Sequence, residues 1–416
     1  MEELREYIDG LTIIDTHEHL PDESERPKDT DFFSEYLRQY FNRDLCSAGV
    51  GAELREKLLD QSLPVEARWT MAEPYWNNCR YTGYGRALEI AVRGLYGIGG
   101  INAGTVREID SRIKASLRQN HYDYVLKQKS NIKVSINDVF THTNPELFRN
   151  VFHLRSYVMP QTREDLRLAG QVLGSAVCGF GDWLQSCEMF IRKAVEAGAA
   201  ALKIALAYER PLYFARSNYH EAENAFNGMF AVLRIPDWLE QPVAVNREFE
   251  DYMMHYALGI IHKIGLPVQI HTGMHEGNGN VLSDSNPTLL SNLFLEYPDT
   301  NFDLFHIGYP YQHETGVLAK TFPNVFIDMC WAQMISPVAC VRAMEEWVET
   351  VPLNKISAFG GDYEVIDAVY GHQVIARENV CRALWTKCEQ GLFDVEEAKR
   401  IARLWFVENP ERLFSL

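Results

Sequence analysis

Two histidines one residue apart end the first apolar run of the sequence. The stretch TIIDTHEH, residues 12–19, places His17 and His19 on either side of Glu18. Side chains alternate in direction along an extended backbone, so the two imidazoles point the same way and Glu18 points away. Together the imidazoles can bind one divalent metal ion, because Zn²⁺ and Mn²⁺ both accept imidazole nitrogen as a ligand. The pair therefore indicates a candidate metal site.

Ionisable residues also stand at the ends of later apolar runs. Three histidines and one aspartate suit a catalytic metal site that keeps a position open for water, which the ion activates as a nucleophile. Each residue alone has an ordinary explanation, and Asp362 in GGDY could belong to a turn. Lys203 lies between apolar residues, which argues against an exposed position. The residues are Asp138, Lys203, His271, His306, Asp328 and Asp362.

Eight apolar runs, most of them separated by helical patterns, are the elements that would position these residues. Near-continuous apolar strands divided by helices are typical of a parallel sheet covered on both faces, and eight such units predict a (β/α)8 barrel of the TIM type. The carboxyl ends of its strands would meet at one mouth. An open doubly wound sheet is the alternative, but no glycine-rich phosphate loop follows the first strand. The predicted strands are residues 11–19, 132–139, 151–158, 200–208, 266–273, 302–310, 324–331 and 355–363, and the clearest helices are residues 183–198, 246–265, 288–298 and 338–352.

Residues 21–130 interrupt this alternation and indicate an insertion. Residues 1–20 contain the first predicted strand, and residues 131–416 contain the rest of the barrel and two closing C-terminal helices. The insertion is rich in Trp, Tyr and Arg, has a mostly helical pattern and follows a barrel strand, where loops reach the substrate face. We therefore predict a helical cap at the barrel mouth. An oligomer interface would use exposed aromatic residues equally well.

The composition excludes several classes of partner. The chain has 416 residues and a formal charge of −17, from 40 basic and 57 acidic residues. Nucleic acids and anionic membrane surfaces attract clustered Lys and Arg, so neither is expected as a partner. Eight cysteines lie singly without a CxxC pair, which indicates reduced thiols in a cytoplasmic protein. No apolar run reaches transmembrane length, and we expect a small-molecule substrate.

Five further residues are candidates for contact with that substrate. His275 lies on a glycine-rich loop after the fifth predicted strand, and Tyr309 and Tyr311 follow the sixth. Trp331 follows the seventh and would form an apolar wall. Arg86, in the insertion, would hold a substrate carboxylate, because arginine binds carboxylates through two parallel hydrogen bonds. A flexible surface loop is the alternative for His275, and an ordinary surface position is the alternative for Arg86.

The motifs together resemble those of the amidohydrolase superfamily. The resemblance rests on DTHEH after the first strand, Lys203 on the fourth, QIHTG around His271, FHIGYPY around His306, GGDY around Asp362, and ENPERLF near the C-terminus. It covers the predicted barrel but not the insertion. Within the superfamily, the chain is most similar to the amidohydrolase-related group, which includes metal-dependent hydrolases, aromatic-acid decarboxylases and, further off, uronate isomerases.

The resemblance implies a barrel with one or two divalent ions. In members with one ion, the residue matching His306 polarises the substrate or moves protons. In members with two ions, a carboxylated lysine on the fourth strand bridges them, and Lys203 lies on the matching strand. A tyrosine soon after Lys203 favours a lysine that contacts substrate, so we expect one ion, Zn²⁺ before Mn²⁺, and a homo-oligomer. The implied metal ligands are His17, His19, His271 and Asp362.

These features predict a metal-dependent hydrolase that acts on a small carboxylated amide, lactone or ester. Activated water would attack the carbonyl, Asp362 would accept its proton, and His306 or Lys203 would stabilise the oxyanion. The alternatives are a non-oxidative decarboxylase of a small carboxylic acid and a uronate-type sugar-acid isomerase, which would use the same ligands. A barrel without catalysis need not keep the whole ligand set, so a non-enzymatic role is disfavoured.

Overall fold

Eight parallel strands form one sheet in the structure, a computed structural model that describes residues 1–117, 120–138, 144–233 and 246–416. Each strand pairs with the next one along the chain. Most strand residues are buried, as expected for a sheet covered on both faces. The strands are β1 (Ile13–Glu18), β2 (Ile132–Asn137), β3 (Phe148–His153), β4 (Ala201–Ile204), β5 (Val268–Ile270), β6 (Phe302–Leu304), β7 (Val325–Asp328) and β8 (Ile356–Ser357).

Hydrogen bonds close the barrel between β1 and the segment that follows β8. The backbone N–H of Asp362 donates to the carbonyl oxygen of His17 at 2.8 Å, and the N–H of His19 donates to that of Tyr363 at 3.0 Å. A sheet closed in this way leaves no free edge, and its strands end at one mouth. The predicted (β/α)8 barrel is confirmed.

The third strand begins and ends earlier than the sequence pattern predicts. The pattern favours residues 151–158, whereas β3 spans Phe148–His153 and Arg155–Val158 form helix α9. Pairing with β2 and β4 sets its register, in which His153 faces Lys203. Partners on both sides decide where a strand stops, and the local pattern carries no information about them.

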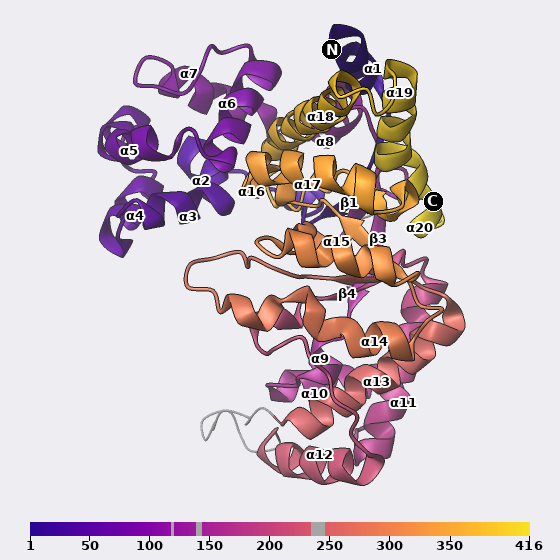
Figure 1. The fold of residues 1–416 in the computed structure, drawn as a ribbon. Coiled ribbons are helices and arrows are strands. Elements are labelled where there is room, and N and C mark those ends of the chain that lie inside the picture. The colour runs from indigo at the N-terminus through magenta and orange to yellow at the C-terminus, as the bar shows by residue number, and fades with distance from the viewer. Residues whose placement is uncertain (118–119, 139–143, 234–245) are drawn as a thin grey trace.

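Amphipathic helices cover the outside of the barrel (Figure 1). Helix α13 is typical: Phe249 and Met253 are buried, Asn246 accepts a hydrogen bond from the N–H of Phe249 at its start, and Gly265 follows its end with a φ of 79°. The helices outside the insertion are α1 (Glu2–Gly10), α9 (Arg155–Val158), α10 (Arg163–Leu173), α11 (Phe180–Glu196), α12 (Tyr219–Leu233), α13 (Arg247–Ile264), α14 (Ser291–Glu296), α15 (Gln312–Thr321), α16 (Ala332–Ile335), α17 (Pro337–Thr350), α18 (Ile366–Glu389), α19 (Val395–Arg403) and α20 (Asn409–Leu413).

The chain between β1 and β2 is helical, as predicted for the insertion, and α2 to α7 gather on one side of the barrel (Figure 1). Trp69 and Trp76 of α5 pack against each other with ring centroids 5.9 Å apart. Trp69 also contacts Phe32, and Trp76 contacts Phe41, so aromatic rings hold these helices together. The helices are α2 (Phe32–Tyr36), α3 (Tyr40–Ser47), α4 (Ala52–Leu59), α5 (Val65–Cys79), α6 (Gly83–Tyr96), α7 (Val106–Ser116) and α8 (His121–Asp123), followed by a π-helix (Tyr124–Lys129).

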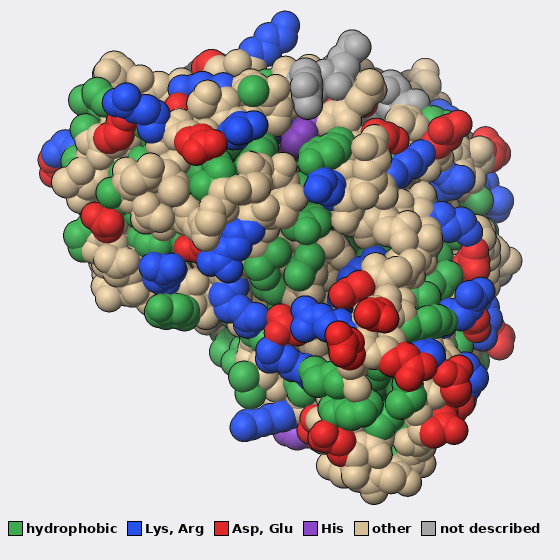
Figure 2. Space-filling view, turned by 90° about the horizontal axis from the view of Figure 1, so that it is seen from above, with side chains coloured by type: hydrophobic (Ala, Val, Ile, Leu, Met, Phe, Trp, Pro, Cys, Tyr) green, Lys and Arg blue, Asp and Glu red, His purple; other side chains and the backbone are tan. Residues whose placement is uncertain are grey.

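Three observations bear on the expected partners. Lys and Arg lie among Asp and Glu on the face drawn in Figure 2, without a large area of a single sign. All eight cysteines are free thiols. Within the described ranges, no helix combines the length and the apolar character that a membrane span requires.

Arg377 of α18 ties this helix to the start of the chain and to the turn before β2. Its buried guanidinium donates to the carbonyl oxygens of Leu11 at 2.9 Å, Ser130 at 3.0 Å, and Ile8. We expect Arg377→Met to lower the free energy of unfolding by roughly 3 kcal/mol, because buried carbonyl groups lose their donor. Chemical denaturation followed by circular dichroism measures this change.

Arg382→Met is the matched control on the same helix. Arg382 has a side chain that is 50% exposed and pairs with Glu378 one turn away. Exposed pairs of this kind contribute little, so we expect a change below about 0.5 kcal/mol. Equal losses of stability in the two variants would contradict the structural role of Arg377.

Candidate metal centre and cavity

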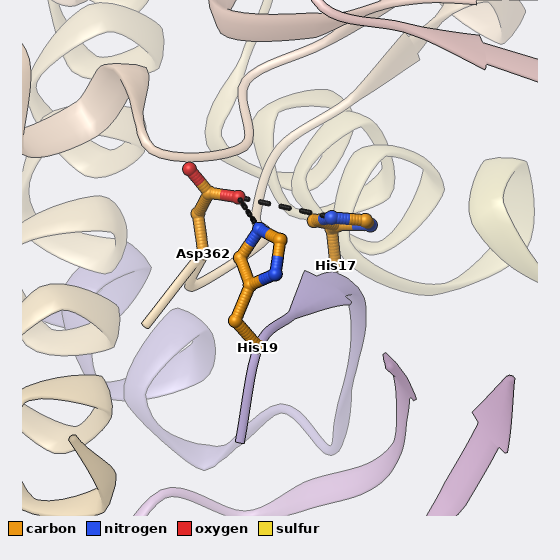
Figure 3. A group of neighbouring side chains, drawn as sticks. All are labelled: His17, His19 and Asp362. Atoms are coloured by element: carbon orange, nitrogen blue, oxygen red, sulfur yellow. Dashed lines mark ion pairs between the residues drawn. The ribbon is translucent and has the colours of Figure 1, made fainter. Parts of the chain in front are cut away.

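Barrel closure brings His17 of β1 and His19, which directly follows this strand, together with Asp362 (Figure 3). Oδ1 of Asp362 lies 3.3 Å from Nε2 of His19 and 3.8 Å from Nε2 of His17. One ligand atom from each residue lies within 4.8 Å of the other two. The structure thus brings together three of the four predicted ligands, from opposite ends of the sequence.

The hydrogen bonds of His17 determine which of its ring nitrogens is free. Nδ1 lies 3.1 Å from Oε1 of Gln269, whose Nε2 donates to the carbonyl oxygen of Thr16 at 3.0 Å. The amide oxygen can only accept, so His17 donates from Nδ1 and its Nε2 carries a lone pair. Burial lowers the pKa of His17 to about 3, which keeps the ring neutral. A neutral imidazole is the form that binds a metal.

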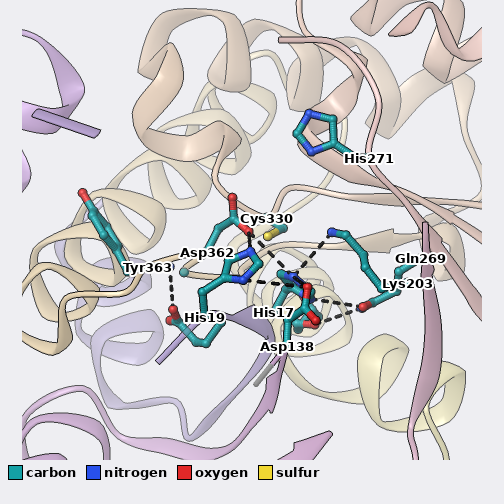
Figure 4. A network of polar contacts seen from close by, with 12 residues as sticks. His17, His19, Asp138, Lys203, Gln269, His271, Cys330, Asp362 and Tyr363 are labelled. Atoms are coloured by element: carbon teal, nitrogen blue, oxygen red, sulfur yellow. Dashed lines mark hydrogen bonds and ion pairs between the residues drawn. The ribbon is translucent and has the colours of Figure 1, made fainter. Parts of the chain in front are cut away.

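A second carboxylate, Asp138, faces the same lone pair (Figure 4). Its Oδ2 lies 3.5 Å from Nε2 of His17 and 3.7 Å from Nδ1 of His19. Burial opposes its ionisation, but hydrogen bonds with His153 at the end of β3 and with His17, together with nearby positive charge, outweigh burial and hold the pKa of Asp138 well below its usual range. The residue follows β2, and although the sequence pattern marks it as a strand end, nothing local assigns it to the metal.

Lys203 is the cation nearest to this group. Its side chain is buried, its Nζ lies 3.4 Å from Nε2 of His17, and the same atom lies 3.6 Å from the centroid of the Phe305 ring. Burial lowers the pKa of Lys203, although Asp362 and other carboxylates oppose this. The position agrees with the apolar residues that flank Lys203 in the sequence.

The residues of this group fit a divalent ion. Burial opposes the ionisation of Asp362, but a hydrogen bond with His19 and the charge of that imidazole hold the pKa of Asp362 well below the usual range. An ionised Asp362, an ionised Asp138 and a neutral His17 are all electron-pair donors, and donors that face one another need a cation between them. Zn²⁺ and Mn²⁺ accept this mixture of imidazole and carboxylate.

His271 and His306 form a separate pair next to the three ligands. Nδ1 of His271 lies 3.0 Å from Nε2 of His306, and the outer nitrogens lie 2.9 Å from the carbonyl oxygen of Met274 and 2.8 Å from that of Cys330. Burial lowers both pKa values, that of His306 to about 4, so both rings are neutral. Each outer nitrogen must carry the proton that it donates to its carbonyl oxygen. The two nitrogens that face each other, Nδ1 of His271 and Nε2 of His306, therefore both carry lone pairs. Metal binding by His271 stays a prediction.

A cavity of about 340 Å³ opens beside these residues. Its wall includes His19, His271, Lys203 and Asp362, together with residues that the sequence did not indicate. Four of these come from the insertion, and the others end or follow barrel strands. They are Arg38, Gln39, Tyr40 and Arg43 from the insertion, and His153, Ala205, Tyr208, Glu276 and Glu364 from the barrel.

Gln39 and Tyr40 hold Asp362 in place. The hydroxyl of Tyr40 donates to Oδ2 and to the carbonyl oxygen of Asp362, at 2.6 Å each, and Nε2 of Gln39 donates to the same carbonyl at 3.1 Å. Asp362 has a φ of 61°, a left-handed conformation that few non-glycine residues adopt. These hydrogen bonds stabilise it and leave Oδ1 directed at His17 and His19. No local pattern in the sequence distinguishes Gln39 or Tyr40 from other insertion residues.

None of the five predicted substrate residues is among the described residues that line this cavity. Trp331 is buried and stacks on Tyr40 with centroids 4.7 Å apart, so it supports the wall from behind. Arg86 forms an ion pair with Glu378 at 3.4 Å. The ring of His275 stacks on Tyr208, and the hydroxyl of Tyr311 donates to a backbone carbonyl, while Tyr309 precedes Pro310 in a cis peptide bond.

Comparisons with known proteins agree with this architecture. The amidohydrolase family model matches residues 192–416. Protein fluG of Emericella nidulans is 26% identical over 181 residues, which is 42% of this chain, and the match spans about a fifth (21%) of that longer protein.

Two isomerases are among the solved structures that match over 99% of the chain. A uronate isomerase of Thermotoga maritima has a TM-score of 0.79 at 14% identity and is covered over 96% of its length. A glucuronate isomerase of Caulobacter crescentus has a TM-score of 0.77 at 18% identity and is covered over 93%. At these identities, the likeness shows the fold alone.

The Tyr40 hydroxyl gives a first test of the site. We expect Tyr40→Phe to weaken Zn²⁺ binding by about 10- to 100-fold, because Asp362 loses the hydrogen bonds that orient it. Competition with a chelating dye measures the affinity. Tyr36→Phe is the control, since the buried hydroxyl of Tyr36 has no hydrogen-bond partner among the residues that the structure describes. Equal affinities of Tyr40→Phe and the wild type would contradict this role.

Zn²⁺ binding should also depend on pH. Burial lowers the pKa of His19, but its hydrogen bond with Asp362 and the charge of that carboxylate outweigh burial, and the pKa is raised overall. A proton on His19 competes with the metal, so affinity should increase as the pH rises above the ordinary pKa of histidine, about 6.5, and that proton leaves. Calorimetry in buffers of different ionisation enthalpy should detect proton release on binding. A pH-independent affinity without proton release would contradict this assignment.

Proposed function

Because the chain belongs to the amidohydrolase family, we propose that it is a metal-dependent hydrolase that acts on a small carboxylated amide, lactone or ester. The observation that carries the proposal is the group of electron-pair donors formed by His17, His19 and Asp362 at the wall of a cavity. These three residues would hold one divalent ion, Zn²⁺ in preference to Mn²⁺, with His271 as the fourth ligand that the family resemblance implies.

When bound, such an ion supplies Lewis-acid chemistry, which polarises a carbonyl and lowers the pKa of water. Asp362 would accept the proton of the attacking water at Oδ1 and pass it to the leaving group. Its other oxygen is held by Tyr40, so a single oxygen is directed at the reacting atoms. His306, buried next to His271, would be a second group for proton transfer.

The charges of the cavity wall support an anionic substrate. Three cationic side chains and four carboxylates line the cavity, so with its histidines neutral, as metal binding requires, one divalent ion would give the wall a net charge of +1. The ammonium group of Lys203 would stabilise the oxyanion or hold a carboxylate. Its Nζ lies 3.4 Å from Nε2 of His17, next to the candidate metal ligands. The charged residues are Arg38, Arg43, Lys203, Asp138, Glu276, Asp362 and Glu364.

One observation favours a second candidate, the isomerisation of a sugar acid. The carboxylate of Glu364 lines the cavity, and its side chain has no hydrogen-bond or ion-pair partner in the part of the chain that the structure describes. Such a group would accept hydrogen bonds from substrate hydroxyls. Decarboxylation of a small carboxylic acid would use the same metal ligands and is the third candidate.

Metal content and turnover together test the hydrolase. We expect about one Zn²⁺ or Mn²⁺ per chain in protein purified without chelator, and loss of it in the His17→Ala/His19→Ala variant. Asp362→Asn should lower turnover of carboxylated lactones, esters and amides by about 10²- to 10⁴-fold, because the proton acceptor is removed. Elemental analysis and a substrate panel give both readouts.

Three results would redirect or overturn the proposal. Release of CO2 without uptake of water would indicate the decarboxylase, and interconversion of a uronate panel would indicate the isomerase. Two ions per chain would support a carboxylated Lys203. Hydrolysis that survives both metal removal and Asp362→Asn would contradict the mechanism.

A further inference from the structure

Most polar side chains of the cavity wall are bonded to other parts of the protein. Arg43 donates to Glu276 at 2.7 Å, and the Tyr40 hydroxyl donates to Asp362 at 2.6 Å. His153 is bonded to Asp138, and both ends of the Gln39 amide are bonded to the segment after β8. A donor already paired within the protein contributes less to ligand binding than a free one. The polar groups without a partner in the protein are therefore the better indicators of the chemical groups that the ligand carries.

Arg38 differs from Arg43 in this respect. Both line the cavity, but the guanidinium of Arg38 makes no hydrogen bond or ion pair with any residue in the described ranges. The side chain is exposed, so the charge stays accessible from solvent. A guanidinium presents its donors in one plane and matches the two oxygens of a carboxylate better than an ammonium does.

The backbone of Arg38 is anchored beside Asp362, a candidate metal ligand. Arg38 lies between α2 and α3, next to Gln39 and Tyr40, which both donate to Asp362. Oε1 of Gln39 also accepts from the N–H of Glu364 at 2.8 Å. Arg38 is thus adjacent in the chain to the two residues that hold Asp362, a candidate metal ligand. The length of the Arg38 side chain therefore limits how far from Asp362 its guanidinium can lie.

The other unpaired groups of the wall suit different partners. The hydroxyl of Tyr208 accepts from the N–H of Glu276 at 2.9 Å and donates to no residue in the described ranges. Burial raises the pKa of Tyr208, so its hydroxyl remains a neutral donor. The carboxylate of Glu364 would repel an anion, and Lys203 lies against His17. Among these groups, Arg38 combines a positive charge with unpaired donors.

We propose that Arg38 binds a carboxylate of the substrate that is separate from the reacting carbonyl. This inference rests on the proposed function, because it assigns the reacting end to the metal ligands and the second end to Arg38. The substrate class is then a small molecule with two anionic or oxygen-rich ends. One end would lie at His17, His19 and Asp362, and the other end would lie at the insertion. Arg38, and not Arg86 as predicted from the sequence, would then be the insertion arginine that recognises the substrate carboxylate.

Calorimetric titration of the Zn²⁺-loaded full chain tests the proposal. The probes are the dicarboxylates from malonate to adipate, each beside the monocarboxylate with the same number of carbon atoms. We expect at least one dicarboxylate to bind the wild type more tightly than its monocarboxylate. Arg38→Met should weaken that dicarboxylate at least about tenfold and leave the monocarboxylate unchanged. Arg38→Lys should be intermediate, because it keeps the charge but not the planar donors.

Arg55→Met is the control, because Arg55 is an exposed arginine of α4 in the same insertion and is not among the described cavity residues. Dicarboxylate binding that is equal in Arg38→Met and the wild type would overturn the proposal, and so would an equal loss in Arg55→Met. Zinc content and turnover are measured on the same samples. Binding that depends on Arg38 in a protein without hydrolase turnover would overturn the proposed function and support this carboxylate site.

Discussion

Barrel closure is the constraint on which the candidate site depends. The hydrogen bonds of His17 and His19 with the segment after β8 join the first strand to the last. They place Asp362 within 4 Å of two histidines that precede it by more than 340 residues in the sequence. The same contact leaves Asp362 with a φ of 61°. A closed parallel barrel thus creates the site and strains the residue at its centre, and other contacts must hold that residue.

The electrostatics follow from this geometry. Gln269 directs the lone pair of His17 toward Asp138 and Asp362, and both carboxylates have pKa values well below the usual range. Lys203 lies at the edge of the group with a lowered pKa. Without a metal ion, the charges are balanced by the nearby lysine and by a proton on His19, whose pKa is raised. This balance explains why the group suits a divalent cation and why binding one should displace a proton.

The insertion completes the site chemically. Tyr40 and Gln39 stabilise Asp362, while Arg38 and Arg43 contribute the cationic part of the cavity wall. The barrel therefore supplies the candidate metal ligands, and the insertion supplies two residues that hold Asp362 and two arginines of the cavity wall. Such a division would let the recognition surface vary while the metal site stays the same, as is general for barrels whose loops carry specificity.

The sequence by itself determined the elements and the chemistry at their ends. Apolar periodicity indicated eight strands, and the spacing of His17 and His19 indicated a shared direction, because both properties are local. Tertiary structure decided where β3 ends, that Asp138 faces His17 and His19, and that Arg38 lines the cavity while Arg86 pairs with Glu378. These facts depend on which distant segments the closed sheet brings into contact, and no short stretch of sequence encodes those contacts.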